Sequence, residues 1–297
     1  QTLRKNRFKD GALDIDVPEL EAVLDAKQEL ADLRVRENDI AHQMVEECMI
    51  AANEAVATEL HSRRVKFIAR LHEEPDAEKL EELRANLAKM GVKTGNLADR
   101  KSFARLLKTI KGHALEGTVA VMVLRSLKKA VYDAKSTGHW GLAKKYYAHF
   151  TSPIRRYVDL TLHRQLQSCL DGEGGMTDGA ALAKTAGHAT ERETNAAEAE
   201  RSLMELKKFR FLEKNPGPWE AVVTKVANFG VFVDIPALAA SGMVKLRDLS
   251  HKFVRWDEAA EELSTFTQRW QIGTKMIVLV KNVDYEHRWV DFIAIGH

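Results

Sequence analysis

Two adjacent arginines, Arg155 and Arg156, are the strongest chemical signal in the sequence. We expect a helix over residues 151–170, with Ser152 as its cap and Pro153 at the first helical position. Both arginines would then occupy the first turn, where the helix dipole disfavours cations by a few tenths of a kcal/mol or more. A phosphate held there by backbone N–H groups and guanidinium groups would compensate for their charge.

A purely structural interpretation of this pattern stays open. Arg155 would then pair with Asp159 at i,i+4, and Arg156 would be solvated. One face of the helix is apolar and is expected in the core; it carries Ile154, Val158 and Leu162. The preceding run, Tyr146-Tyr147-Ala-His149-Phe150, supplies rings on which bases stack, and this favours RNA as the ligand.

The charge distribution supports a polyanionic partner. From Arg100 to Gln165 the sequence has 14 Lys/Arg and 3 Asp/Glu, a balance of 14 − 3 = +11, although the whole chain carries only +2. A concentrated basic segment favours binding to phosphates. The alternative is that local acidic partners neutralise helix-surface lysines.

Length and composition exclude several classes of protein. The 297 residues suffice for about two domains, and 45% hydrophobic residues allow a sizeable core. No apolar run approaches the roughly 20 residues needed to span a bilayer. Two cysteines cannot form a disulfide framework, and a reducing, cytoplasmic compartment fits best. Because the sequence starts in mid-pattern at Gln1, we expect it to be part of a longer protein.

The elements that must position the arginines are mainly helical. The periodicity predicts helices over residues 39–60, 73–91, 102–110, 119–132 and about 178–212, with a shaped loop over 138–150. In the first of these helices, the pattern predicts a buried stripe of Ile40, Met44, Val45, Cys48, Ala52, Ala55 and Val56.

The clearest boundary is Asn215-Pro-Gly-Pro218, after which the hydrophobic period changes from 3.6 to 2. Strands are predicted over residues 219–226, 229–235, 275–284 and 288–295. The sequence therefore predicts an α+β protein with a mostly helical part over residues 1–214 and a five-stranded antiparallel OB-fold barrel over residues 215–297.

The arginine segment resembles the signature of the ribonuclease II/ribonuclease R family of exoribonucleases, and its ribonuclease R branch most. The resemblance extends over the whole chain in order. It is carried by Gly11-Ala-Leu-Asp-Ile-Asp, Glu46-Glu-Cys-Met-Ile-Ala-Ala-Asn53, Leu124-Arg-Ser126, Gly138-His-Trp-Gly-Leu-Ala143, Tyr147 through Arg164, and Glu198-Ala-Glu-Arg201.

This resemblance implies the C-terminal portion of an RNB catalytic domain, which threads single-stranded RNA and removes nucleoside 5′-monophosphates from its 3′ end. It implies a catalytic role for Arg155, which would neutralise charge at the scissile phosphate. It also implies RNA contacts for a set of residues in the helical part: Arg156, Tyr157, His149, Glu47, Glu200, Arg201 and Arg125.

Some of these assignments have ordinary alternatives. Helical angle places Glu47 beside the expected buried stripe, where a carboxylate would accept a hydrogen bond from a ribose 2′-OH; it would otherwise be a surface glutamate. Glu200 and Arg201 would otherwise form a solvated helix face.

The family chemistry uses Mg²⁺ held by clustered aspartates, which the resemblance places upstream of this chain. Asp14 and Asp16 provide two ligands at best, and they fall where the family has a strand without ligands. We therefore expect no metal site in these residues. The chain alone would bind RNA without cleaving it, and the upstream half of the same protein would be a partner.

The C-terminal barrel resembles the RNA-binding OB-fold of the ribosomal-protein S-one type. Phe229 and Phe232 would stack on bases, although one of them would otherwise belong to the barrel core. Lys245 replaces the family's usual histidine and would contact phosphate, and Arg288 belongs to the last hairpin. Single-stranded RNA is the expected ligand, and the protein is expected to be monomeric.

Two hypotheses follow, together with a third that explains less. The first is a 3′-to-5′ exoribonuclease, and the second is a non-catalytic RNA-binding or scaffold member of the family. A helical interaction protein fused to an OB barrel would explain neither the arginines nor the basic segment.

Overall fold

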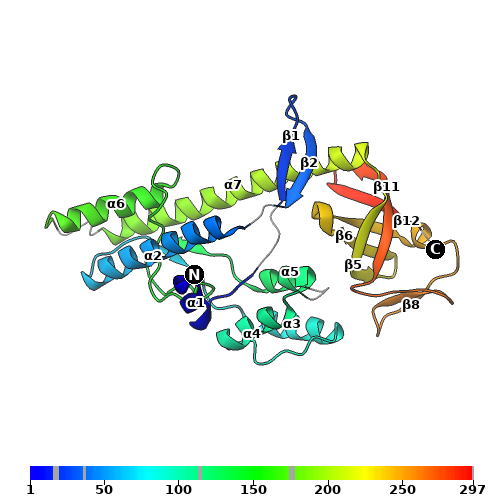
Figure 1. Ribbon diagram of the computed structural model, residues 1–297, viewed down its shortest axis with the longest axis horizontal. Coiled ribbons are helices and arrows are strands. Elements are labelled where there is room, and N and C mark those ends of the chain that lie inside the picture. The colour runs from blue at the N-terminus through cyan, green and yellow to red at the C-terminus, as the bar shows by residue number, and fades with distance from the viewer. Residues whose placement is uncertain (16–19, 36–37, 113–115, 174–177, 296–297) are drawn as a thin grey trace. The chain divides into compact units, whose positions relative to one another are not determined.

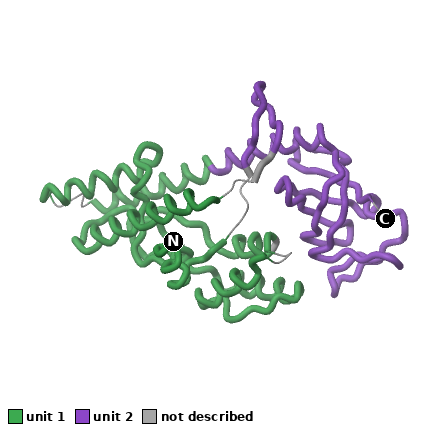
Figure 2. The backbone as a smooth tube through the Cα atoms, viewed as in Figure 1, with its two compact units in different colours: residues 1–17, 37–196 green, residues 18–36, 197–297 purple. Residues whose placement is uncertain are grey.

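The computed structural model describes residues 1–15, 20–35, 38–112, 116–173 and 178–295. The chain forms two compact units, which are described separately (Figure 2). The first comprises residues 1–17 and 37–196, and the second comprises residues 18–36 and 197–297. Within the described residues, no helix has the length and apolar character needed to cross a membrane.

The first unit is mainly helical, as the periodicity predicts (Figure 1). Its helices are α1 (Thr2–Lys9), α2 (Ile40–Ser62), α3 (Ala77–Lys89), α4 (Arg100–Ile110), α5 (Glu116–Ser126), α6 (Tyr157–Leu170) and the first part of α7 (Gly179–Lys214). The helix expected to reach residue 132 ends at Ser126 instead. The reason is that β4 (Val131–Asp133) pairs antiparallel with β3 (Ala69–Leu71), so residues 131–133 are extended.

Helix α2 is capped by Asp39 and buries a face other than the predicted one. Asp39 accepts hydrogen bonds from the backbone N–H groups of residues 41 and 42, at 2.9 Å each. The predicted apolar stripe is wrong, since Ile40 is 67% and Met44 is 64% exposed. The buried residues are Glu47, Ile50, Asn53, Ala57 and Leu60. Two of these are polar and have polar partners in the fold, a burial that hydrophobic periodicity cannot detect.

Helices α3, α4 and α5 share a hydrophobic core. The predicted stripe of α3 is buried through Leu80, Leu83 and Leu87. It packs with Phe103 of α4 and Val123 of α5. This core also contains Trp140, from the loop that precedes the arginines, so the loop is anchored on the helices.

The second unit contains a closed barrel of five strands, in the order β11-β12-β7-β6-β5. The strands are β5 (Trp219–Ala227), β6 (Gly230–Ile235), β7 (Ala240–Lys245), β11 (Lys275–Asp284) and β12 (Trp289–Ile295). The expectation of an antiparallel barrel holds for four of the five pairings. The fifth differs, because β12 runs parallel to β7.

Strand β7 was missing from the predicted strands because it begins Ala-Ser-Gly, which are poor strand formers. The barrel nevertheless requires Gly242 there, since a Cβ at this position would overlap the ring of Phe292 and the carbonyl of Val290. Tertiary packing therefore selects a residue that local propensity disfavours.

Further elements complete the second unit. A hairpin is formed by β1 (Leu20–Leu24) and β2 (Leu30–Val35), and the last part of α7 also belongs here. Between β7 and β11 the chain forms α8 (Leu246–Leu249) and a small sheet of β8 (Arg255–Asp257), β9 (Glu262–Ser264) and β10 (Arg269–Trp270). A 3-10 turn over Pro236–Leu238 links β6 to β7.

Candidate functional site

The two arginines lie in a turn before α6 rather than in its first helical turn. Helix α6 begins at Tyr157, and Arg156 is its N-cap residue in extended conformation. The Ser152 carbonyl accepts hydrogen bonds from the N–H groups of Arg155 and Arg156, at 3.3 and 3.0 Å. The predicted helix start is therefore wrong by several residues. Ile154, expected in the core, lies at the tip of this turn and is fully exposed.

Asp159 holds the turn together and orients Arg156. One carboxylate oxygen of Asp159 accepts a hydrogen bond from the Ser152 N–H at 2.8 Å. The same carboxylate accepts two bonds from the Arg156 guanidinium, from Nε and Nη2, at 2.8 Å each. Asp159 has no exposed surface. The compensating anion for Arg156 is therefore an internal carboxylate, and its bidentate geometry fixes the guanidinium.

Arg155 has a different environment from its neighbour. Its side chain is exposed, and the guanidinium forms no hydrogen bond or ion pair with any described residue. The alternative pairing of Arg155 with Asp159 is therefore wrong, because Arg156 takes that partner. Next to the turn, Tyr157 is 59% exposed, and the buried hydroxyl of Thr151 has no hydrogen-bond partner among the described residues. One cation and one buried hydroxyl, both without a partner among the described residues, thus lie in this segment.

His149 lies close to both arginines and is held as a neutral ring. Its Nδ1 is 2.7 Å from the hydroxyl of Tyr132. Burial, followed by the positive charges of Arg156, Arg70 and other neighbours, lowers the pKa of His149 to about 3. Burial raises the pKa of Tyr132 to about 12, so this phenol keeps its proton at neutral pH. The pair is therefore uncharged, although the Arg70 guanidinium lies 4.5 Å above the Tyr132 ring.

Glu47 is buried in an ion pair. Its Oε1 accepts bonds from Nε and Nη2 of Arg7, at 2.9 and 2.5 Å, and both side chains are less than a tenth exposed. Glu46 has a side chain that is 42% exposed and pairs with Arg4 and Arg7. The structure thus places Glu47, and not Glu46, on the inner face of α2, while a contact of Glu47 with ribose stays a prediction.

A buried hydrogen-bond network connects α2 to the segment before the arginines. Asn53 donates to the Tyr147 hydroxyl at 3.1 Å and accepts from the Phe150 N–H at 2.9 Å. The Phe150 carbonyl lies 2.8 Å from Nε2 of His163, and the two rings stack at 4.0 Å. Residues 147–150 are therefore fixed on both sides, by α2 and by α6.

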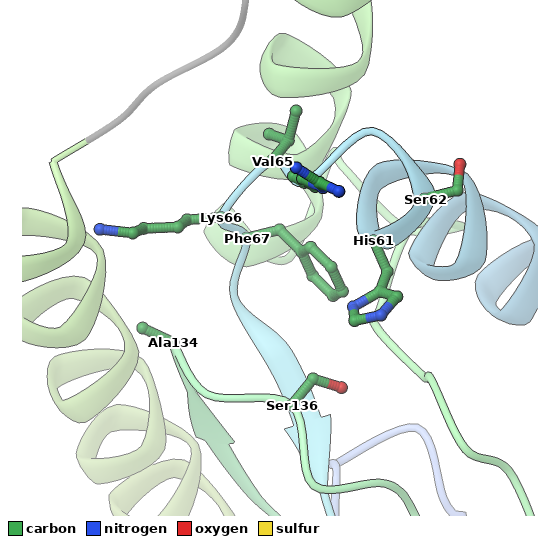
Figure 3. Close-up of a pocket in the computed structure, with 8 residues that line it drawn as sticks. His61, Ser62, Val65, Lys66, Phe67, Ala134 and Ser136 are labelled. Carbon is green, nitrogen blue, oxygen red and sulfur yellow. The ribbon is translucent and has the colours of Figure 1, made fainter.

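A cavity of about 600 Å³ opens elsewhere in the first unit (Figure 3). It is lined by residues 61–67, except 63, together with Ala134 and Ser136. In Figure 3 the ammonium group of Lys66 extends away from His61 and Ser136. The polar groups that line this cavity do not converge on one point, and none of the predicted site residues lines the cavity.

On the barrel, aromatic rings form a face with cations beside it. Phe229 is 54% exposed and packs edge-to-face on Phe232 at 6.1 Å, and Phe232 packs similarly on Trp289 at 5.8 Å. Lys225 lies 5.7 Å above the Phe232 ring. We call Phe229, Phe232 and Trp289 the aromatic face. Neither predicted phenylalanine is in the fully buried barrel core.

The two predicted cations of the barrel are paired. Lys245 is 2.7 Å from Asp291, and its side chain is 38% exposed. Arg288 donates to the Ser202 hydroxyl at 2.8 Å and lies 3.9 Å from Glu205, both on α7. An RNA phosphate would have to share or replace these partners.

The RNB domain model matches residues 1–172, and the S1 RNA binding domain model matches residues 219–292. The first match covers more than half of the chain. The chain belongs to the RNB family. Its RNB segment contains the arginine turn, and its S1 segment contains the aromatic face.

Similar proteins agree with this membership. Ribonuclease R of Thermotoga maritima is 35% identical over 99% of this chain and 43% of its own length. Ribonuclease R of Mycoplasma genitalium shares the fold at 24% identity, with TM-scores of 0.88 for the apo form and 0.87 for the complex with ribose methylated single-stranded RNA; each match covers 99% of this chain and 48% of that one. Yeast Ssd1, described as a pseudonuclease, matches with a TM-score of 0.64 and 22% identity, over 74% of this chain and 28% of its own. This chain spans less than half the length of each of these relatives.

The described part of the RNB segment does not provide a magnesium site. No group of three or more His, Cys, Asp or Glu side chains that could hold a metal occurs among the residues that the structure describes. Asp14 forms ion pairs with two cations, Arg4 at 3.4 Å and Lys111 at 3.3 Å. Asp16 lies outside the described residues. The side chains present therefore do not fit Mg²⁺ by themselves.

The remaining predicted residues are exposed. Arg125 is in the last turn of α5, and the structure shows no contact between it and the residues around Arg155. Glu200 and Arg201 are exposed on the part of α7 that belongs to the second unit. Their roles stay predictions.

Sequence reasoning missed four residues that shape the site: Arg7, Asn53, Tyr132 and Asp159 as the partner of Arg156. One signal was available for Asn53, because Glu47, Ile50 and Asn53 follow the i,i+3 spacing of a single helix face. Arg7 and Tyr132 come from distant segments, and no local sequence pattern indicates their contacts, which form only in the folded structure.

Proposed function

We propose that this RNB-family chain is part of a 3′-to-5′ exoribonuclease that degrades single-stranded RNA processively. In each cycle the oxygen of a water molecule bonds to the phosphorus of the terminal nucleotide, and the bond from that phosphorus to the O3′ of the preceding nucleotide breaks. The O3′ receives a proton, and the released nucleotide keeps its phosphate on the 5′ oxygen. Ribonuclease R is the name of a relative that is 35% identical over 99% of this chain, and this supports the proposal.

The observation that carries this proposal is the contrast between the two adjacent arginines. Arg156 is locked by a fully buried carboxylate, while Arg155 projects from the same turn without a partner among the described residues. A cation that is carried on a fixed backbone turn and has no internal partner is available to stabilise charge that develops on a phosphate. We therefore assign Arg155 to the scissile phosphate and Arg156 to the shape of the turn and to a further phosphate contact.

The neighbouring groups suit a site that binds a polyanion and distinguishes RNA from DNA. His149 is neutral, so its Nε2 can form a hydrogen bond with a sugar or phosphate. The ring does not change its charge near neutral pH. Tyr157 offers an exposed ring for stacking. We assign Glu47 to the ribose side of the site, where its carboxylate would favour RNA over DNA.

The metal that this chemistry needs is expected from outside the 297 residues. Mg²⁺ lowers the pKa of a bound water and stabilises negative charge on the leaving oxygen. Because the described residues do not fit the ion, we propose that this chain supplies the arginine part of the site and that an upstream aspartate cluster supplies the metal. The chain alone then binds RNA without cleaving it.

The decisive experiment uses the full-length protein, a 3′-tailed RNA and Mg²⁺. We expect Arg155→Ala to lower the cleavage rate by a factor of about 10² to 10³, as for the loss of one transition-state contact. RNA affinity should fall little. Arg105→Ala is the matched control, because Arg105 is an exposed arginine of the same basic segment. Equal rates for Arg155→Ala and wild type would remove Arg155 from the chemistry.

A second experiment tests the divided site. The 297-residue chain is incubated with labelled RNA and Mg²⁺, alone and after mixing with a fragment that carries the upstream aspartates. Cleavage is expected only in the mixture. Cleavage by the chain alone would show that the metal site lies within it.

The non-catalytic alternative has one observation in its favour, since the fold is shared with a protein described as a pseudonuclease. The two functions separate in the same assay. A full-length protein that binds the RNA tightly and leaves its 3′ end intact in Mg²⁺ would be a binding or scaffold protein.

We also propose that the protein is monomeric and cytoplasmic.

A further inference from the structure

The small sheet of β8, β9 and β10 gathers an unusual set of side chains at one end. In its register, Arg255 of β8 pairs with Ser264 of β9, and Ser264 in turn pairs with Arg269 of β10. Residue 253 comes two residues before Arg255, and residue 266 comes two residues after Ser264. Both therefore lie beyond the same end of the sheet. Both are phenylalanines. We call this the Phe253/Phe266 end.

These two rings are the most exposed aromatic side chains described in the protein. Phe253 is 87% and Phe266 is 107% exposed, compared with 54% for Phe229 on the aromatic face. Burying a phenylalanine is worth about 1.5–3 kcal/mol, so two rings left in water represent an unused driving force for binding. Single exposed apolar residues are common, but two at one end of a sheet are not scattered.

The turn that carries Phe266 is well ordered. The Thr265 hydroxyl accepts hydrogen bonds from the N–H groups of residues 267 and 268, at 3.3 and 3.1 Å. The Thr265 N–H donates to the Gln268 carbonyl at 2.8 Å. The ring is thus held outward by a closed turn, and its exposure does not come from a frayed chain end.

Charge distinguishes the two ends of this sheet. Lys252, Arg255 and Arg269 lie at the Phe253/Phe266 end, and all three side chains are exposed. The opposite end, around the turn between β8 and β9, is acidic through Asp257, Glu258, Glu261 and Glu262. Glu262 forms an ion pair with Arg269 at 3.8 Å, so Lys252 and Arg255 are the cations of this end without a described acidic partner. Rings flanked by cations complement a ligand that has flat bases and phosphates.

We propose that the Phe253/Phe266 end binds single-stranded RNA, as a second stacking surface of the S1 segment besides the aromatic face. Two bases stack on Phe253 and Phe266, and the cations contact the intervening phosphates. The proposal rests on the proposed function, because it takes RNA as the ligand. An acidic sheet end next to the basic one orients the strand, since phosphates are repelled by it.

The binding test uses the whole 297-residue chain and a fluorescent single-stranded RNA of about 16 nucleotides, long enough for an extended OB-fold site. The double variant Phe253→Ala/Phe266→Ala should weaken binding at least about tenfold, since one stacked base is worth about 1–3 kcal/mol. Its thermal stability should match wild type because both rings are exposed. Leu170→Ala, which removes an exposed apolar side chain of the first unit, should bind like wild type.

Cross-linking locates the contact. RNA that contains 4-thiouridine is irradiated on the protein, which is then digested with trypsin. The sequence places Phe266 in the peptide of residues 256–269, and Phe229 and Phe232 in the peptide of residues 226–245. We expect cross-links in both peptides of wild type, and loss of the first in Phe266→Ala.

Three outcomes would overturn the proposal in distinguishable ways. Unchanged affinity of the double variant, with cross-links in the 226–245 peptide alone, rejects the second surface and leaves the proposed function intact. No RNA binding by wild type rejects both. A wild-type dimer that the double variant converts to a monomer, with RNA affinity unchanged, assigns the two rings to a protein contact instead.

Discussion

The arginine turn and the aromatic face of the barrel place their functional groups by opposite means. At the turn, a buried carboxylate holds the backbone that carries Arg155 and the guanidinium of Arg156, and this carboxylate, Asp159, has no solvent exposure. On the barrel, Phe229 and Phe232 rest on each other and on Trp289 without needing a polar partner. A charge that must meet a scissile bond requires fixed geometry, whereas a ring that stacks on any base tolerates movement.

This difference has an energetic consequence. Removing one member of a buried charged pair leaves the other without a partner, which costs several kcal/mol. Removing a half-exposed ring costs little stability, although it removes binding energy. Substitutions of Asp159 and Arg156 should therefore affect folding and activity together, and those on the aromatic face should affect binding alone.

The largest expected effect is that of Asp159→Asn. The new amide nitrogen would face the Arg156 guanidinium, donor against donor, and leave a charge unpaired. We expect the first unit to lose about 3–5 kcal/mol of unfolding free energy. Urea unfolding can follow this unit selectively with fluorinated tryptophan, because Trp140 is its single indole.

Asp171→Asn serves as the control at the other end of α6. Asp171 is exposed and caps the C-terminus of the helix, where the dipole disfavours a negative charge. A change below about 0.5 kcal/mol is expected there. Similar losses for Asp159→Asn and Asp171→Asn would contradict the picture of a turn fixed by one buried carboxylate.

The pH dependence of stability is the next largest effect. Burial is the main cause that lowers the pKa values of His139 and His149 to about 3, whereas an unfolded histidine has a pKa near 6.5. Between these values only the unfolded state binds the proton, so stability falls as the pH drops below about 6.5. At pH 5 each histidine should cost about 2 kcal/mol relative to pH 7.

His149→Gln tests this directly. The variant should show a smaller loss of unfolding free energy between pH 7 and pH 5 than wild type, read at Trp140. His188→Gln, at an exposed position of α7, should retain the full loss. A pH dependence unaltered by His149→Gln would mean that His149 takes up its proton equally in the folded and the unfolded protein.

Much of the fold was predictable because its signals are local. The 3.6-residue stripe of α3 and the period-2 strands β5, β6, β11 and β12 follow from hydrophobic pattern. The arginine pair was visible as a motif for the same reason. Its segment stands out by residue type and needs no knowledge of distant partners.

The parts that escaped prediction depend on distant contacts. The inner face of α2 is polar because Arg7 and Tyr147 provide partners for Glu47 and Asn53. The start of α6 is delayed because Asp159 binds the N–H of Ser152 and draws the preceding residues into a turn. In both cases a side-chain hydrogen bond across the fold overrides a local pattern.

The aromatic face offers a smaller effect on binding. Phe229→Ala should weaken binding of single-stranded RNA by about 1–3 kcal/mol, and it should leave unfolding unchanged. Val233→Ala, a fully buried neighbour in β6, should instead destabilise the barrel and leave the affinity of the folded protein similar. Equal destabilisation by both variants would place Phe229 in the barrel core, which is the alternative given for it in the sequence analysis.

The smallest effect is expected for Arg125→Gln, which tests whether exposed basic residues far from the turn contact RNA. Arg125 is exposed at the end of α5, so stability should change by less than about 0.5 kcal/mol. If Arg125 neutralises one phosphate, the slope of log affinity against log salt should become shallower by about 0.7. Arg84→Gln is the control, because Arg84 is exposed but bound to Glu81 on α3. An unchanged slope for Arg125→Gln would remove Arg125 from the phosphate contacts and leave the contacts assigned to the arginine turn as they are.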